Sequence, residues 1–521
     1  MQHRSGSEGS PTPVARRAVL VGMLATGTSI LLSACGGAAA TVTASSGSVA
    51  LSASGSAASS VAATTALATS AVASSAISSA SSLTSTSAAS SAAVASSASA
   101  TPVPPTVTPR PGTKAITFLE RAGQNYQNFF KQAIDKFQQE QPGYSVLAEY
   151  STSYHDKLIA EVAGGTAPDV VFTSDDDLFS LAAKGVVIDI GPYFTRDKLN
   201  KSDWFDIALT PQFLRGKQYA MPLDLGVWAL WVNKDLFKKA GVAFPDDTWD
   251  FNKFQAAAEQ LTVDSKGAHA PGLDPTSVVQ AGFNDSAFTY GIDIPVGAYG
   301  GSVFDDQVTK CLLQEQPAVD GLQWTADFTN KLHAALGAGI KTQGTVNFNS
   351  GNLAMQIQGS WAIGAVCGTG TCSFDWDIYA PPKGPVKDII LAEASGISQA
   401  SGSKNPDGGW LFNKYMTGPE GQLLAFQNTV ASVPSIKSVA DKAYSTWNKQ
   451  PASMKILSDL ASKASIPYWQ RAVSDTEFED LFSKGLAPLF QGKQDAQAVL
   501  ASVTGQANAL LQKDQQYLAG K

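Results

Sequence analysis

Acidic side chains stand directly after two apolar runs early in the patterned part of the chain. Glu120 and Arg121 close the first run, and Asp175 and Asp176 follow the second. Carboxylates accept hydrogen bonds and guanidinium groups donate them, so both places offer polar groups to a small solute. We therefore treat these four residues as candidate binding residues.

The elements around these acids are predicted from hydrophobic spacing. Strands are expected at 114–120, 144–150 and 168–172, and helices at 125–141, 154–164 and 177–184. Strands that alternate with helices over short connections predict a parallel α/β sheet with right-handed crossovers. In such sheets ligands bind beyond the carboxyl ends of the strands, where the four candidate residues lie.

The thiol of Cys35 is a second reactive group, and it follows an apolar segment at 18–32 that Arg16 and Arg17 precede. A charged start, a short apolar core and small residues at the end are typical of an export signal. The segment is too short and too rich in Gly, Thr and Ser for a membrane-spanning helix. The end Leu-Ser-Ala-Cys resembles a bacterial lipobox, which implies cleavage before Cys35 and a lipid on its thiol. An ordinary secretory peptide is the alternative.

We therefore predict a lipoprotein signal peptide at 1–34, and its arginine pair also fits twin-arginine export. A stalk is predicted at 35–113, because 38–100 is almost only Ser, Ala, Thr, Val and Gly and 101–111 is rich in proline. Such a segment buries too little apolar surface to offset the entropy cost of ordering it. Glycosylation of the stalk and the choice of export route stay open.

Composition excludes several classes of function. Among 521 residues, 44% are hydrophobic and the net charge is −7 without a basic block, which argues against nucleic-acid binding. The chain has 4 histidines and neither a Gly-x-Ser-x-Gly elbow nor a phosphate-binding loop. Neither a metal nor a cofactor is expected. Cys367 and Cys372 could close a small disulfide loop, and Cys311 could instead pair with either one.

Several motifs occur in a specific order along the folded part. They are Gly-Gly-Thr-Ala-Pro-Asp before an apolar strand within 154–172, Gly-Lys-Gln-Tyr-Ala-Met-Pro at 216–222, Trp-Val-Asn-Lys-Asp-Leu-Phe from Trp231, Gly-Ser-Trp ending at Trp361, and later matches at 403–407 and 431–434. In this order the chain resembles the extracellular solute-binding proteins of sugar ABC importers, such as maltose-binding protein.

The resemblance implies a two-lobe, type II periplasmic-binding-protein-like α/β fold with crossing strands and a ligand cleft. The first lobe would hold 114–221 and 356–393, and the second would hold 222–355 and 394–521. The protein would be a lipid-anchored monomer at the outer face of the cell membrane or in the periplasm. It would capture a mono- or oligosaccharide by lobe closure and deliver it to the permease subunits of an ABC importer.

The same resemblance extends the set of candidate binding residues, since sugars need carboxylates or amides for their hydroxyl edges and flat rings for their apolar faces. Trp361 is expected to stack on a sugar ring, with a core tryptophan as the alternative. Asp176 either contacts ligand or caps the following helix, as Asp175 or Asp177 could. The further candidates are Asp224, Trp228, Trp469 and Arg471.

A secreted glycosidase that uses two carboxylates is the rival interpretation. The many acids would allow it, but no catalytic pair can be chosen from the sequence. The family motifs also span the chain without leaving room for a catalytic module, so we expect a binding protein and not an enzyme. Which sugar it binds stays open.

Overall fold

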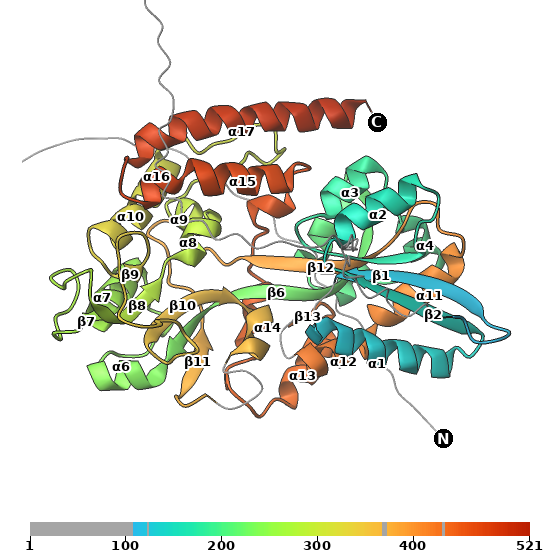
Figure 1. The fold of residues 1–521 in the computed structure, drawn as a ribbon, viewed down its shortest axis with the longest axis horizontal. Helices are drawn as coiled ribbons and strands as arrows, with labels where there is room; N and C mark the ends of the chain where they lie inside the picture. Colours follow the sequence, from blue (N-terminus) through green and yellow to red (C-terminus); the bar gives the residue numbers. More distant parts are fainter. Residues whose placement is uncertain (1–107, 122–123, 367–371, 430–432, 521) are drawn as a thin grey trace, which may run out of the picture. The chain divides into compact units, whose positions relative to one another are not determined.

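The computed structural model describes residues 108–121, 124–366, 372–429 and 433–520, which belong to one compact unit that begins at Ser99 (Figure 1). The predicted signal peptide, Cys35, Cys367 and almost all of the predicted stalk lie outside these residues. The folded part starts earlier than the expected Lys114. The backbone N–H of Arg110 donates to Ser145 Oγ at 3.0 Å, which holds the end of the predicted stalk against the sheet.

Three parallel strands and their connecting helices open the fold, as the sequence predicts. β1 (Lys114–Arg121) lies between β2 (Tyr144–Ser151) and β3 (Val170–Thr173) and is parallel to both. The helices are α1 (Gln124–Glu140), α2 (Tyr154–Ala163) and α3 (Leu178–Lys184). The apolar stripe of α1 packs on this sheet through residues such as Phe130 and Phe137, which are fully buried.

Two strands run through both halves of one eleven-stranded sheet, in which the main path is β2-β1-β3-β12-β6-β10-β8-β7 (Figure 1). The first half of β6 (Ala220–Asn233) pairs with β12 (Ala392–Gln399), and β12 also pairs with β3. The second half of β6 pairs with β10 (Leu353–Gly359) and β11 (Trp376–Tyr379). We call the half-sheet around β1 the first lobe and the half-sheet around β10 the second lobe.

Strand pairing assigns parts of 356–393 and of 394–521 to other lobes than the sequence predicts. β10 and β11 pair with the second half of β6, so 356–379 join the second lobe and not the first. Beyond Ser395, β12 pairs with β3, and α11 (Pro406–Met416) and α12 (Pro419–Thr429) pack on the first lobe and not on the second. Hydrogen bonds between neighbouring strands decide which half-sheet a segment joins, and the order of motifs does not specify them.

The remaining elements cover the two lobes. The strands are β4 (Phe213–Leu214), β5 (Lys217–Gln218), β7 (Val263–Asp264), β8 (Val278–Asn284), β9 (Ala335–Leu336) and β13 (Val433–Pro434). The α-helices are α4 (Gly191–Arg196), α5 (Asp206–Leu209), α6 (Lys234–Ala240), α7 (Phe251–Leu261), α8 (Ser286–Tyr290), α9 (Asp293–Ala298), α10 (Gln316–Asn330), α13 (Lys437–Ser445), α14 (Ile456–Ala461), α15 (Asp475–Gly485), α16 (Ala487–Phe490) and α17 (Ala496–Ala519). The 3₁₀ turns are η1 (Lys201–Asp203), η2 (Thr210–Gln212), η3 (Ser360–Ala365) and η4 (Tyr468–Gln470).

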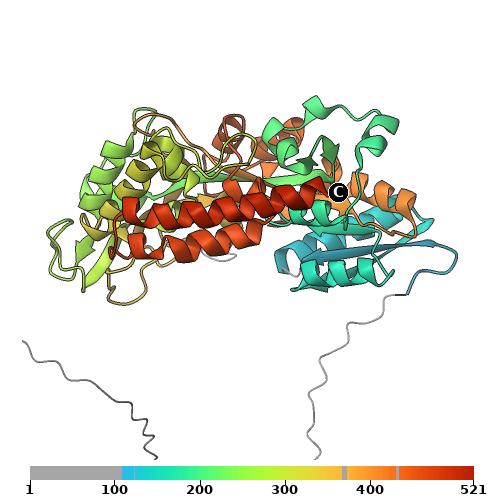
Figure 2. The ribbon, with the colours of Figure 1, turned by 90° about the horizontal axis from the view of Figure 1, so that it is seen from above.

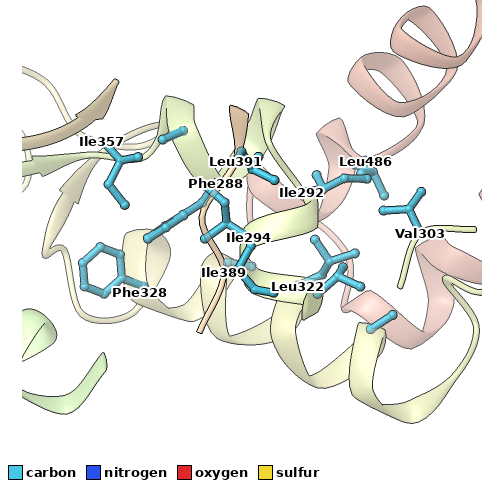
Figure 3. Packing of buried hydrophobic residues seen from close by; sticks show 14 of the residues in the cluster. Phe288, Ile292, Ile294, Val303, Leu322, Phe328, Ile357, Ile389, Leu391 and Leu486 are labelled. Atoms are coloured by element: carbon cyan, nitrogen blue, oxygen red, sulfur yellow. The ribbon is translucent and has the colours of Figure 1, made fainter. Parts of the chain in front are cut away.

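The largest apolar cluster lies in the second lobe (Figure 3). Phe288, Leu322 and Leu391 meet there from α8, α10 and the segment before β12, and each is at most 1% exposed. Fully burying one such side chain contributes about 1.5–3 kcal/mol. Cys311 belongs to this cluster as a free, buried thiol, whereas Cys372 is disulfide-bonded. The alternative in which Cys311 forms a disulfide is therefore wrong.

The C-terminal helix α17 lies beside α15 and packs on the second lobe through Val499, Leu500 and Leu511 (Figure 2). Its end reaches the first lobe, because Arg215 Nη1 donates to the carbonyl oxygen of Leu518 at 2.6 Å. Within the described part of the chain, no helix has the length and apolar character needed to cross a membrane.

Candidate functional site

Arg121 and Asp175 meet at the carboxyl ends of β1 and β3, where parallel pairing was predicted to bring them. Arg121 Nη1 donates to Ser174 Oγ at 2.9 Å, and Ser174 Oγ donates to Asp175 Oδ1 at 3.0 Å. Asp175 and Asp176 are both half-buried. The turn after β3 therefore holds a guanidinium and two carboxylates at the end of the sheet.

Asp177 completes a run of three aspartates but does not cap α3 with its side chain. It occupies the N-cap position, yet its carboxylate makes no capping hydrogen bond. Its Oδ2 instead accepts a hydrogen bond from the hydroxyl of Tyr154. Its Oδ1 is buried and has no hydrogen-bond partner among the described residues.

Glu393 joins this group from the crossing strand β12. Trp228 Nε1 on β6 donates to Glu393 Oε1 at 2.9 Å. Burial and then the charge of Asp175 raise the pKa of Glu393, so the two carboxyl groups lie near each other.

Two further carboxylates come from α15, on the second lobe. Tyr290 Oη donates to Glu479 Oε1 at 2.9 Å. The pKa of Asp475 and that of Glu479 are each raised by the charge of Asp176, which places both near the aspartates of the first lobe. Carboxyl groups from both lobes and from the crossing strand β12 therefore belong to one acidic group.

Four aromatic rings line the same region. The ring centroids of Trp228 and Trp361 are 5.9 Å apart, and those of Trp228 and Trp469 are 6.3 Å apart. Tyr290 lies 4.7 Å from Trp469. Trp361 is 38% exposed and Tyr290 is 46% exposed, whereas Trp228 and Trp469 are buried. Two rings therefore present open faces, supported from behind by two buried ones.

Glycines on two neighbouring strands allow the ring of Trp361 to lie against the backbone. A Cβ at Gly359 would stand 1.7 Å from Cζ3 of this ring, and a Cβ at Gly226 would stand 2.5 Å from Cε3. Any side chain at either position would therefore push the ring away. The close approach that the small residues before Trp361 suggest is present in the structure.

Burial is the largest cause of the raised pKa of four carboxyl groups in this region, those of Asp175, Glu393, Asp475 and Glu479. It raises the pKa of Asp175, with the charge of Asp176 as the next cause. It raises the pKa of Glu393 well above the ordinary value, and the charge of Asp175 adds to this. It also raises the pKa of Glu479 and brings that of Asp475 to about 8. The site is short of positive charge and rich in hydrogen-bond acceptors.

Three predicted binding residues lie outside this group. Glu120 is fully buried, its oxygens have no hydrogen-bond partner in the described ranges, and burial raises its pKa to about 9. Asp224 is buried and accepts a hydrogen bond from Tyr126 Oη at 3.2 Å. Arg471 Nη2 donates to the carbonyl oxygen of Asp305 at 2.8 Å.

Arg471 lines a different cavity, with a volume of about 610 Å³. Asp293 and Lys387 contribute to its walls from the second lobe, and Asp206 and Lys437 contribute from the other side. None of the four aromatic rings lines it. Its acidic and basic side chains occur in similar numbers, unlike the acid-rich aromatic group.

A protein-family comparison decides which class of protein carries this site. The family model described as bacterial extracellular solute-binding protein matches residues 123–423, more than half of the chain. This chain belongs to the bacterial extracellular solute-binding protein family. A binding protein of Brucella abortus (strain 2308) is 23% identical over 399 residues, which cover 74% of this chain and 90% of that protein. The maltotriose-binding protein of Pyrococcus abyssi is 22% identical over 323 residues, or 59% of this chain and 63% of that protein.

Solved structures agree on the fold of this solute-binding protein. The ABC substrate-binding protein Lmo0181 of Listeria monocytogenes, in complex with cycloalternan, superposes with a TM-score of 0.65 at 20% identity. The match covers 76% of this chain and 98% of that one. The two-lobe α/β fold expected from the motifs is thereby confirmed.

Sequence reasoning missed four residues of the solute-binding protein's acid and aromatic group: Tyr290, Glu393, Asp475 and Glu479. Glu393 lies between Ala392 and Ala394 in an extended run, and both alanines are core residues. Neighbouring residues of a strand point to opposite faces, so this pattern could have placed Glu393 on the face away from that core. Asp475 and Glu479 are four apart on one helical face. Other acids in the same stretch, such as Glu477 and Asp480, hide that spacing.

Proposed function

We propose that this chain is the extracytoplasmic binding component of an ABC importer and that it captures a carbohydrate between its two lobes. The exposed ring of Trp361 carries this proposal, because it lies on glycine backbone beside Trp228, whose Nε1 donates to Glu393. A flat ring suits the apolar face of a sugar, and carboxylates accept hydrogen bonds from its hydroxyl groups. Family membership and the maltotriose named for the relative from Pyrococcus abyssi support it.

Capture would proceed by closure of the lobes. Asp175 and Asp176 belong to the first lobe, and Glu479 and Tyr290 belong to the second. A solute that bonds to both groups is more stable when the lobes are closed, so binding selects the closed arrangement. β6 pairs in both half-sheets and is the natural hinge. The closed form would then be the one that the permease subunits recognise.

The anchor would be the lipid on Cys35, and the tether on the outer side of the membrane would run from Cys35 to about Arg110, where the chain is held against the sheet. Cys35→Ala should leave the protein exported but released into the soluble fraction or uncleaved. Membrane fractionation of the wild type and the variant tests this. A variant that still needs detergent for release would overturn the lipid anchor but not the sugar site.

A thermal-shift screen of the purified protein against mono- and oligosaccharides tests the sugar proposal. A sugar present at about 100 times its dissociation constant stabilises the native state by about 2.7 kcal/mol. Recovery of the sugar uncut after prolonged incubation supports a binding protein, and cleavage would favour a glycosidase. No stabilisation by any sugar would overturn the carbohydrate assignment.

A further inference from the structure

Six carboxylates gather around the aromatic rings, and they come from three separate parts of the fold. They are Asp175, Asp176 and Asp177 after β3, Glu393 on β12, and Asp475 and Glu479 on α15. In the described ranges, no lysine or arginine forms an ion pair with any of them. Arg121, at the end of β1 on the first lobe, donates to Ser174 and not to a carboxylate.

Asp177 adds an independent sign of a missing hydrogen-bond donor. Its side chain belongs to a residue only 7% exposed, and Oδ1 has no partner in the part of the chain that the structure describes. Asp176, Asp475 and Asp175, all acids, are the groups whose charge acts on it. A buried carboxylate oxygen without a donor is costly, so a donor from outside the protein would stabilise it.

The neighbouring rings fit a cation as well as a sugar face. Trp361 and Tyr290 are two of the four large hydrophobic side chains that are exposed in the described chain. A cation is attracted to the face of a Trp or Tyr ring within about 6 Å of its centroid, and more strongly when water is excluded. A neutral sugar would use the rings but would leave the excess of carboxylates uncompensated.

A bound metal ion does not account for these acids. Among the described residues, no group of three or more His, Cys, Asp or Glu side chains is arranged to hold a metal. A metal needs several oxygens converging on one point, whereas an ammonium group donates three separate hydrogen bonds to oxygens around it. Dispersed carboxylates therefore suit an ammonium group.

We infer that the solute captured in this site carries a positively charged amine, as an amino sugar does. The inference rests on the proposed function, because it names the chemical class of the solute for the same site. The amine would lie between the carboxylates of the β3–α3 turn and those of α15, and the sugar ring would lie on Trp361. A positive amine would lower the raised pKa of Glu393 and of Asp475, so that these carboxyl groups could release their protons and pair with it as carboxylates.

Matched sugars that differ only in their amine test the inference by calorimetric titration near neutral pH. Glucosamine, N-acetylglucosamine and glucose form one series, and the β-1,4-linked di- and trisaccharides of each form two more. We expect the free amine to bind about tenfold more tightly than its neutral partners, because a charge-assisted hydrogen bond is about twice as strong as a neutral one. Raising sodium chloride from about 0.05 M to about 0.5 M should reduce this preference, because salt screens charges.

Variants on α15 locate the effect. Asp475→Asn and Glu479→Gln should each weaken binding of the amine more than binding of the neutral sugars, so the preference for the amine should fall. Asp480→Asn is the matched control, because Asp480 is exposed and pairs with Lys484 on the same helix. Melting of each variant without sugar shows whether it is folded. If one of the two α15 variants does not fold, the other still tests the inference.

The outcomes separate the inference from the function on which it rests. Neutral sugars that bind as tightly as the amines would overturn the inference and leave the proposed function standing. Binding of putrescine, a simple diamine, with no binding of any sugar would support a positively charged solute and overturn the proposal that the solute is a carbohydrate. If no sugar and no amine binds, both are overturned.

Discussion

The two faces of β6 differ sharply, although alternate residues of one strand make both. Trp231 points to the face that α13 and α14 cover, where its ring packs against those of Phe348 and Trp376. Trp228 points to the opposite face, donates to Glu393 and supports the open ring of Trp361. The first face is sealed by apolar side chains, and the second gathers acids and keeps two rings exposed. The difference indicates which side of the crossing strands is built for a solute.

Removing Trp231 should cause the largest loss, and the loss should be in stability. Trp231→Ala empties a site that is 1% exposed, and a Trp-to-Ala change in a core costs about 3–5 kcal/mol. Urea unfolding measures the change, and calorimetry on the folded fraction should give an unaltered sugar affinity. If the variant unfolds like the wild type but binds sugar poorly, the two faces have been assigned the wrong way round.

Moving the ring of Trp361 without deleting it should weaken binding by the next largest amount. Gly359→Ala places a methyl group where the ring lies, although the extended backbone there accepts alanine. We expect sugar binding to weaken by about 1–3 kcal/mol, the scale for burying an aromatic side chain. The control is Gly505→Ala on α17, which has no atom within 4 Å of its added Cβ and should leave affinity unchanged. Equal affinities for both variants would show that the position of the ring does not matter.

The acid-rich face should also make stability depend on pH, by a smaller amount. Burial raises the pKa of Asp475 to about 8 from 3.8, so the folded protein holds a proton that the unfolded chain has released. Stability from this group therefore falls as pH rises from about 4 to about 8 and is constant above that. Asp475→Asn removes the cost of burying the ionised carboxylate, so it should raise the melting temperature more near pH 9 than near pH 5. Each kcal/mol of unfolding free energy regained in this way corresponds to about 2–4 °C. The exposed Asp480→Asn should show no such difference, and an equal rise at both pH values would contradict the buried charge.

Much of the fold followed from local patterns, but less of the site did. Hydrophobic spacing and the motif order predicted β1 to α3 and the close approach of Trp361. The same patterns assigned 356–379 and the segment after Ser395 to the wrong lobes. Pairing of β11 and β12 with β6 joins residues more than a hundred positions apart, which local patterns do not specify. The same distance hid Glu393 and Glu479, whose roles depend on partners in Trp228 and Tyr290. Arg471 follows Trp469 by two residues, yet its side chain points to another cavity, which a linear spacing does not specify.

The central claim is that the open face of β6 binds a sugar through Trp361. Calorimetric titration of the wild type and of Trp361→Ala with the tightest sugar from the screen tests it directly, together with melting of both proteins without sugar. Because the ring is 38% exposed before a solute binds, we expect a loss of about 1–3 kcal/mol in binding and almost no change in melting temperature. Tyr517→Ala removes a ring of similar exposure, 39%, on α17 and should change neither. An unchanged affinity combined with a large fall in the melting temperature would make Trp361 a structural residue and contradict the account.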